Sequence, residues 1–232
     1  MNKPKLTTIF RYARGVLFLF GLPVLLFLIA GKWDWWQGWV YIGIIFIASL
    51  ANRIVLTKVH PDLMLERINY SEKKDIKPWD KVLMPLLAMV FPAAYFITAG
   101  FDQRFGWSGE VPLWLYLTAL AITVAAFFLG TWALVENRFF SAVVRIQTER
   151  GHTVVETGPY RFIRHPGYAS AAFIALMFPI MVGSWWSYIP AGFMVIAGGI
   201  RTFLEDRTLI AELPGYLEYT HKTRYRLIPG IW

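Results

Sequence analysis

The sequence predicts an all-α membrane protein, a multi-spanning bundle of about six transmembrane helices. Of the 232 residues, 56% are hydrophobic and only 16% are charged, whereas a soluble domain carries about 25% charged residues. The apolar residues gather in runs of roughly 17 to 25 residues, the length that crosses a bilayer. The basic residues are divided unequally between the loops that join these runs, which is typical of multi-spanning proteins.

Six apolar segments can be drawn, and we expect each to be a transmembrane helix. The last two are short and are joined by residues 182–187 alone, which predicts a tight helical hairpin. The first follows a basic stretch, as in a signal peptide, but it exceeds the usual apolar length and no A-x-A cleavage site follows. We therefore expect one membrane domain over residues 1–232. The segments are Gly15–Ala30, Trp35–Ala51, Val82–Phe101, Val111–Val135, Gly167–Met181 and Tyr188–Leu204.

The basic residues predict the orientation. Of the 23 lysines and arginines, 21 lie in the N-terminal region, the loops after the second and fourth segments, and the C-terminal region, which leaves Lys32 and Arg104 for the other side. The positive-inside rule then places both termini in the cytoplasm. The loops assigned outside hold tryptophans that we interpret as an aromatic belt in the headgroup region. These are Trp33, Trp35, Trp36, Trp39, Trp107, Trp114, Trp185 and Trp186.

The composition also excludes several kinds of site. The absence of cysteine excludes structural disulfides, thiolate metal sites and a catalytic thiol. His60, His152, His165 and His221 never stand at metal-ligand spacing, so we expect no metal site. The net charge of +8 follows from the positive-inside distribution, and we expect no nucleic-acid partner.

Chemically useful groups concentrate in the polar segments assigned to the cytoplasm. Residues 147–168 combine glycine and proline turns, whose backbone amides can face a ligand, with Tyr160 and His165 among arginines. Such a loop can bind an aromatic base, a carboxylate and a cation, but it also suits a positively charged interfacial loop. Arg201 and Glu205 stand at i and i+4 near the end of the last segment. Ionisable groups there are expected to be paired, hydrated or functional, and a helical ion pair is the simplest interpretation.

With these residues in view, the chain resembles the isoprenylcysteine carboxyl methyltransferase family, whose members are multi-spanning S-adenosylmethionine-dependent enzymes related to phospholipid N-methyltransferases. The signature covers roughly residues 136–232. It departs from the family at two points. Glu205 is followed by Asp206 and Arg207 where consecutive glutamates are frequent, and Gln147 lies closer to His152 than in eukaryotic members. The matching residues are His152 to Val155, Gly158 to Tyr160, Arg164 to Tyr168, Arg201, Glu205, Asp206, Tyr216, Tyr219 and the segment 224–229.

The resemblance implies a cytoplasmic pocket, roofed by the C-terminal segment, that binds S-adenosylmethionine within residues 136–232. It implies catalytic roles for Arg201, which would face the substrate, and for Glu205, which would also hold the cofactor. The lipid substrate would enter sideways from the bilayer. The other residues implied to line the cofactor site are Gln147, His152, Thr153, Val154, Val155, Tyr160, His165, Pro166, Gly167 and Tyr168.

We therefore expect an integral membrane methyltransferase with its active site on the cytoplasmic side and with membrane lipids and a hydrophobic or lipidated substrate as partners. A carboxylate acceptor is ionised at pH 7 and needs only a cation to orient it, for which Arg201 is suited. An amine would need deprotonation, with Glu205 or His165 as the nearest base. A phospholipid or small-thiol methyltransferase, a membrane NADPH-dependent reductase with a similar C-terminal segment, and a lipid-binding scaffold remain alternatives. The oligomeric state is not predicted.

Overall fold

The structure is a computed structural model that describes residue 21 and residues 23–232, and within this part of the chain the regular elements are all helical. Residues 21 and 23–30 are helical and precede the first labelled helix. The α-helices are α2 (Trp36–Val59), α3 (Pro61–Ile68), α4 (Asp80–Pro85), α5 (Phe91–Phe105), α6 (Leu113–Glu136), α7 (Pro166–Val182), α8 (Tyr188–Glu212) and α9 (Tyr216–Lys222). The short 3₁₀ turns are Tyr70–Glu72, Thr148–Arg150, Gly158–Arg161 and Trp185–Ser187.

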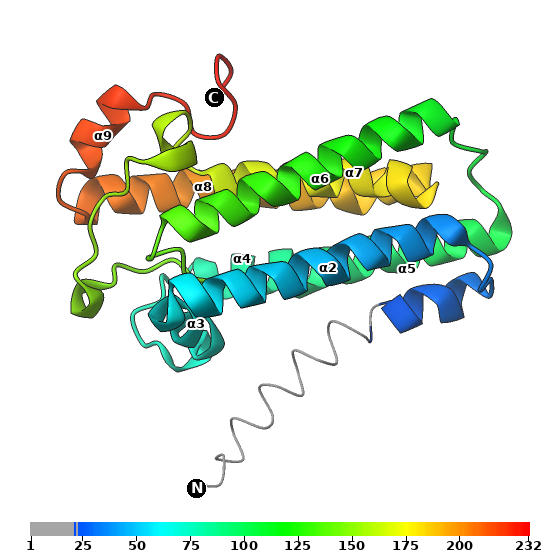
Figure 1. Cartoon of the computed structure of the whole chain (residues 1–232), viewed down its shortest axis with the longest axis horizontal. Helices are drawn as coiled ribbons and strands as arrows, with labels where there is room; N and C mark the ends of the chain where they lie inside the picture. The colour runs from blue at the N-terminus through cyan, green and yellow to red at the C-terminus, as the bar shows by residue number, and fades with distance from the viewer. Residues whose placement is uncertain (1–20, 22) are drawn as a thin grey trace, which may run out of the picture.

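The long helices run side by side as an elongated bundle (Figure 1). In this view α6, α7 and α8 form one layer, and α2 with α4 and α5 forms the other. The layers are joined where α2 packs on α6 and α7 and where α5 packs on α8. The short helices α3 and α9 lie at one end, together with the C-terminus.

Four described helical segments are long and apolar enough to cross a bilayer: Trp36–Val59, Asp80–Phe105, Leu113–Glu136 and Trp185–Glu212. They correspond to the second, third, fourth and sixth predicted segments, and the shorter apolar helix α7 corresponds to the fifth. Of the first predicted segment, Gly15–Ala30, residues 15–20 and 22 lie outside the described residues. The multi-spanning helical architecture is therefore confirmed, while the number of six spans stays a prediction.

Glycines end two of these helices at the same end of the bundle. Gly106 follows α5 with φ +65°, and Gly183 follows α7 with φ +68°. Glycine adopts this left-handed conformation without the steric penalty that a Cβ would bring, and it is the usual residue at such a helix end. After Gly183 the chain turns within a few residues into α8, which confirms the predicted helical hairpin.

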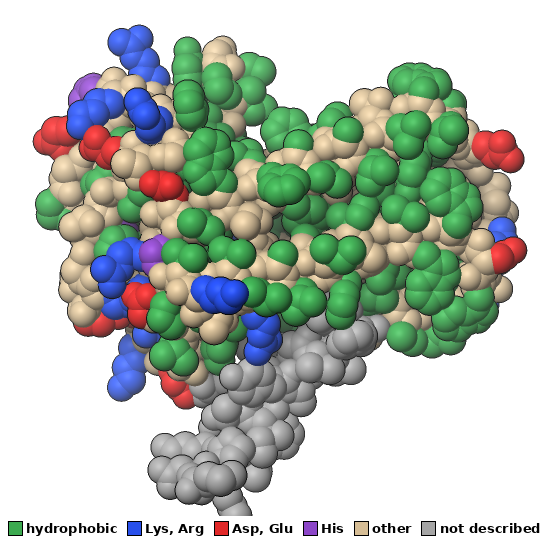
Figure 2. All heavy atoms as spheres, viewed as in Figure 1, with side chains coloured by type: hydrophobic (Ala, Val, Ile, Leu, Met, Phe, Trp, Pro, Cys, Tyr) green, Lys and Arg blue, Asp and Glu red, His purple; other side chains and the backbone are tan. Residues whose placement is uncertain are grey.

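The two ends of the bundle differ in composition (Figure 2). Most of the charged side chains in this view gather at the end that carries α3 and α9, and hydrophobic side chains cover most of the remainder. We call this the arginine end, formed by residues 60–80, 137–165 and 213–232. The opposite, tryptophan end is formed by residues 31–35, 106–112 and 183–187. Seven of the eight tryptophans predicted for the aromatic belt are exposed around it, whereas Trp35 is buried in the core. The exposed ones are Trp33, Trp36, Trp39, Trp107, Trp114, Trp185 and Trp186.

Two local features bring helices into position around the arginine end. Gly130 of α6 meets Ser170 of α7 so closely that an added Cβ would lie 2.7 Å from the serine oxygen. The Ser170 hydroxyl donates to the Ala126 carbonyl oxygen at 2.6 Å, which fixes this contact between the two helices. The segment between α4 and α5, Leu86–Val90, is a π-helix, a form frequent at functional sites.

Candidate active site

A cavity of about 330 Å³ opens at the arginine end, between α4, the loop 137–168 and helices α7, α8 and α9. It brings together residues that are far apart in the sequence. Of the predicted site residues, Pro166 does not line it and instead occupies the first position of α7, where its missing N–H needs no partner. The predicted residues that do line the cavity are Gln147, His152, Thr153, Val154, Val155, Tyr160, His165, Gly167, Tyr168, Arg201 and Glu205.

Arg201 and Glu205 line the cavity from α8, but they do not form the ion pair that their spacing suggests. The Arg201 guanidinium binds Asp80 of α4 instead, with Nε–Oδ1 and Nη2–Oδ2 distances of 2.6 and 3.0 Å. It also donates to the Ala142 carbonyl oxygen at 3.0 Å and lies 5.4 Å from the centre of the Tyr168 ring. Glu205 accepts a hydrogen bond from the Tyr168 hydroxyl at 2.5 Å. Arg201 is thus held from behind by Asp80, and Glu205 is oriented by Tyr168.

His152 and Gln147 form one side of the cavity. The Gln147 side chain is buried, donates to the Phe139 carbonyl oxygen at 2.7 Å, and accepts a hydrogen bond from Arg150. The backbone N–H of Gln147 donates to Nδ1 of His152 at 3.3 Å, so the imidazole proton lies on Nε2. Burial and the nearby Arg150 and Arg145 lower the pKa of His152 to about 4. His152 is therefore neutral at pH 7 and offers an N–H donor.

Tyr160 of the cavity wall is also held in place by hydrogen bonds. The Tyr160 hydroxyl donates to the Ala133 carbonyl oxygen at 3.3 Å and accepts from Asn137 at 3.3 Å. Burial raises the pKa of Tyr160 well above its ordinary value, so the hydroxyl stays neutral. Val154 and Val155 pack beside this ring against Leu213, Tyr216 and Tyr219, which closes the cavity towards α9.

Asp206, next to Glu205, is fully buried and connects the cavity to the C-terminal segment. Arg164 binds it through Nε and Nη2 at 2.8 and 3.0 Å, and Arg226 through Nε at 2.8 Å. The Tyr216 hydroxyl donates to it at 3.0 Å, and Nε2 of His165 lies 3.2 Å away. An ionised carboxylate only accepts hydrogen bonds, so Nε2 of His165 carries the proton. The C-terminal segment is thereby fastened to the loop that precedes α7.

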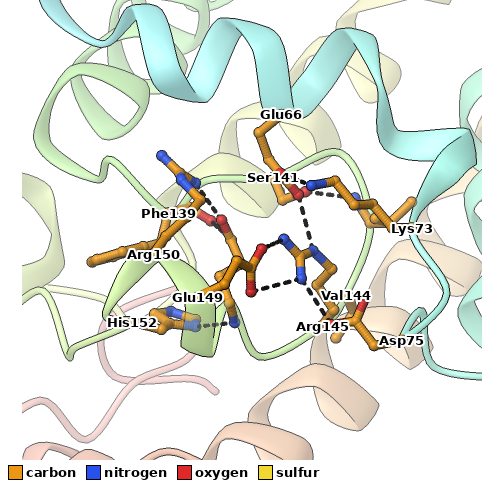
Figure 3. Close-up of polar contacts among 12 residues, drawn as sticks. Glu66, Lys73, Asp75, Phe139, Ser141, Val144, Arg145, Glu149, Arg150 and His152 are labelled. Atoms are coloured by element: carbon orange, nitrogen blue, oxygen red, sulfur yellow. Dashed lines mark hydrogen bonds and ion pairs between the residues drawn. The ribbon is translucent and has the colours of Figure 1, made fainter.

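A second ionic cluster fixes the outer wall of the cavity (Figure 3). The buried guanidinium of Arg145 points towards three carboxylates, Glu66 at 2.9 Å, Asp75 at 2.7 Å and Glu149, and Lys73 also binds Glu66. Burial opposes the charge of Arg145, but the hydrogen bonds that it donates to these carboxylates outweigh this effect and raise the arginine pKa. The cluster connects the loop 139–150 with α3 and the segment that follows α3.

The segment Asp80–Phe105, the third predicted membrane-spanning segment, supplies an apolar wall. Met84 of α4 and Leu87 and Ala88 of the π-helix line the cavity there. Ala88 also lines a second, larger cavity of about 650 Å³ between α2, α5 and the helix over residues 23–30. The lining of this second cavity is almost entirely apolar. The polar site therefore borders a space that suits hydrocarbon.

Sequence reasoning missed three parts of the site: Asp80, the part that Asp206 plays, and the loop 139–145 with its backbone carbonyl groups. For Asp80 a signal exists, because an acidic residue stands directly before the apolar third segment inside a basic loop, and ionisable groups near a membrane helix need partners. Asp206 stood in the matching signature, but no role was predicted for it. No pattern marks the loop 139–145.

Comparison with known protein families matches residues 115–211 to the isoprenylcysteine carboxyl methyltransferase (ICMT) family. The matched region begins in α6 and ends in α8, and it contains every predicted site residue. No curated protein sequence gave a significant match to the chain. The resemblance predicted from the sequence is confirmed over these residues, and the matching family is a family of membrane methyltransferases.

Proposed function

We propose that the chain transfers a methyl group from S-adenosylmethionine to the carboxylate of a lipid-like acceptor, such as a prenylcysteine-type group. The reaction takes place in the cavity at the arginine end, which faces the cytoplasm together with both termini. One observation carries the proposal: Arg201, Glu205 and the polar residues predicted to bind the cofactor line one cavity that also has an apolar wall. Such a cavity suits a water-soluble cofactor and a membrane-derived acceptor together.

The lining residues fit S-adenosylmethionine, which carries positive charge on its sulfonium and amino groups. When bound, this cofactor supplies an electrophilic methyl group. The carboxylate of Glu205 attracts a cation, and the ring faces of Tyr160 and Tyr168 can do the same. His152, neutral at pH 7, adds a hydrogen-bond donor without repelling a cationic ligand. These groups are fixed by the contacts described above, so they need little rearrangement on binding.

Methyl transfer depends chiefly on alignment of donor and acceptor. The acceptor carboxylate is ionised at pH 7 and requires no general base. Arg201 offers a permanently charged planar fork that can orient such a group. Its own orientation is fixed, because Asp80 and the Ala142 carbonyl oxygen hold it from behind. The chain's task is thus to bind, orient and exclude water.

An amine or thiol acceptor is supported less well. Both would need a base, and the two predicted candidates are already engaged. Nε2 of His165 donates to Asp206, and Glu205 accepts from Tyr168. The reductase alternative is not favoured either, because the family that matches residues 115–211 is a methyltransferase family.

Calorimetry with S-adenosylmethionine on the full-length protein in detergent tests the proposal. We expect binding by the wild type and a loss of at least about 10-fold in affinity for Glu205→Gln, which removes a charge but keeps the shape. Arg201→Lys keeps the charge near Asp80 and should lower turnover much more than cofactor affinity. A wild-type protein that binds NADPH but not S-adenosylmethionine would refute the proposal.

The acceptor is identified with labelled methyl donor and three acceptor classes. These are a prenylcysteine-type carboxylate, an amino-phospholipid and a small thiol. We expect label in the carboxylate as a base-labile methyl ester. Label in the phospholipid or the thiol alone would contradict the carboxylate assignment.

A further inference from the structure

One of the four arginines that line the cavity at the arginine end has no carboxylate partner among the described residues. Arg67, Arg145, Arg164 and Arg201 line it, whereas Glu205 is the only carboxylate among its described lining residues. Three of these arginines form ion pairs with carboxylates that do not line the cavity. Arg145 has Glu66, Asp75 and Glu149. Arg164 has Asp206, and Arg201 has Asp80. The remaining arginine, Arg67, lies outside the segment that matches the family.

Arg67 is in the last turn of α3 and is partly buried. Its Nη1 donates to the Phe140 carbonyl oxygen at 2.8 Å, and its guanidinium lies 5.6 Å from the centre of the Phe140 ring. No carboxylate pairs with it among the described residues. Most of its N–H donors therefore have no partner in this part of the chain.

The surroundings of Arg67 make its positive charge unfavourable unless an anion binds to it. Burial and the positive charge of Arg201 lower the pKa of the Arg67 guanidinium. The nearest acid to Arg201 is Asp80, but both of its oxygens bind Arg201 and one also accepts from the backbone N–H of Val144. A partly buried charge without a counter-ion is unfavourable unless a ligand supplies one.

The position of Arg67 indicates which ligand this is. Phe140 connects Arg67 to the predicted cofactor segment, because its ring lies against Gly167. On the other side, Arg201 is joined through Asp80 to α4, and Met84 stands one helical turn beyond Asp80 on the same face. Met84, Leu87 and Ala88 form the apolar wall there. An anionic group between Arg67 and Arg201 would thus have its hydrocarbon part beside the third membrane-spanning segment.

We propose that Arg67 is a specificity-determining residue that binds the carboxylate of the methyl acceptor together with Arg201. This inference rests on the proposed methyl transfer. It adds a binding partner for the acceptor carboxylate, Arg67, that lies outside the segment matched to the family. Arg67 thus selects acceptors that carry an anion beside an apolar chain, and it disfavours amines, because two guanidinium groups repel the protonated form that prevails in water at pH 7.

The reaction removes the charge that Arg67 binds. The acceptor oxygen forms a C–O bond to the methyl carbon, the C–S bond of the sulfonium breaks, and its electron pair remains on sulfur. The ester and the thioether product are thus formed without release of a proton. Because the ester has no negative charge, Arg67 holds the substrate more tightly than the product.

The test compares two ligands that differ in this charge. The affinities of N-acetyl-S-farnesylcysteine and of its primary amide are measured on the full-length protein in lipid nanodiscs, together with KM and kcat for methylation of the acid. For the wild type we expect the acid to bind about 10- to 100-fold more tightly than the amide, as for a hydrogen bond to a charged group. Arg67→Met should lose most of this preference, raise KM by a similar factor, and leave kcat and cofactor affinity near the wild-type values.

Two further variants separate charge from structure. Arg67→Lys keeps the cation and should restore a large part of the preference for the acid. Arg207→Met removes an arginine that is exposed on α8 and does not line the cavity, so it should behave as the wild type. If Arg67→Met loses cofactor affinity instead, Arg67 binds the cofactor carboxylate and the proposal is wrong.

The proposal also fails if the wild type binds acid and amide equally, or binds neither. A farnesyl phosphate is tested as a competitor for the same site. If it competes more strongly than the acid, and if this competition also depends on Arg67, the anion that Arg67 binds is not a carboxylate. A protein that methylates acceptors without regard to their charge would refute this inference alone. A protein that shows the charge preference but transfers no methyl group would refute the proposed function alone.

Discussion

Two buried carboxylates at opposite ends of the bundle are satisfied in different ways. At the tryptophan end, Asp102 is 1% exposed, and its donors among the described residues are neutral. These are the Ser108 N–H at 2.7 Å and the hydroxyls of Ser108 and Ser184 at 2.6 and 2.5 Å. At the arginine end, Asp206 is 0% exposed and is bound by Arg164 and Arg226.

The two sets of contacts connect different parts of the molecule. The Asp102 contacts close short connections between neighbouring helices, and they place no arginine or lysine beside the carboxylate. The Asp206 contacts join α8 to the loop before α7 and to the C-terminal segment. They also orient cationic groups beside a cavity. We call the contacts of Asp102 with Ser108 and Ser184 the neutral cap. We call the contacts of Asp206 with Arg164 and Arg226, beside the cavity, the charged framework.

The largest effect should follow from breaking this framework. Asp206→Asn leaves Arg164 and Arg226 without a counter-charge, which should destabilise the fold by about 3–5 kcal/mol. Denaturant unfolding in detergent measures the free energy, and limited proteolysis should cut within residues 223–232. Glu218→Gln is the control, since Glu218 is exposed on α9. Equal stability of the two variants would contradict the role assigned to Asp206.

A smaller effect is expected at the neutral cap. Asp102→Asn keeps one acceptor oxygen but turns an amide towards hydroxyl donors, which should lower the free energy of unfolding by about 1–3 kcal/mol. Cofactor affinity at permissive temperature should not change, because Asp102 does not line the cavity at the arginine end. A large loss of cofactor affinity would show that the two ends are coupled, and the comparison would fail.

A third effect concerns the pH dependence of stability at the arginine end. The pKa of His152 is lowered from 6.5 to about 4 by burial, Arg150 and Arg145, with Glu149 opposing. Between these values the unfolded chain binds the proton and the folded chain does not, so stability falls as pH falls from about 6.5 towards 4. The slope from one proton is at most about 1.4 kcal/mol per pH unit. Melting curves should show a flatter dependence in this window for His152→Gln, and an unchanged slope would contradict the burial of His152.

The sequence predicted much of this architecture because long apolar runs and basic loops are local signals. The same holds for the segment 147–168, whose turns and aromatic residues are contiguous. The structure brings these residues into one cavity with Arg201 and Glu205. Pairings across the bundle were not predictable in the same way. Asp80 and Arg201 are 121 positions apart, and hydropathy does not report how a helix is rotated about its axis.

Arg67 illustrates the same limit. In the sequence it is one of many basic residues in a loop assigned to the cytoplasm, and the positive-inside rule explains it fully. Only the three-dimensional arrangement separates it from the arginines that have carboxylate partners. The i, i+4 spacing of Arg201 and Glu205 was equally ambiguous, since it predicts a helical ion pair where the structure has contacts to Asp80 and Tyr168.

The π-helix at Leu86–Val90 has a consequence for how the two halves of the third membrane-spanning segment are rotated. A π-helical turn contains one residue more than an α-helical turn, so it shifts the angular phase between the two halves of the segment. Each residue of an α-helix advances the side chains by about 100°. If the same residues instead continued as a regular α-helix, Asp80 would turn away from Arg201 or α5 would turn away from its neighbours. The geometry of the site therefore depends on a local irregularity inside an apolar stretch, and hydropathy does not report it.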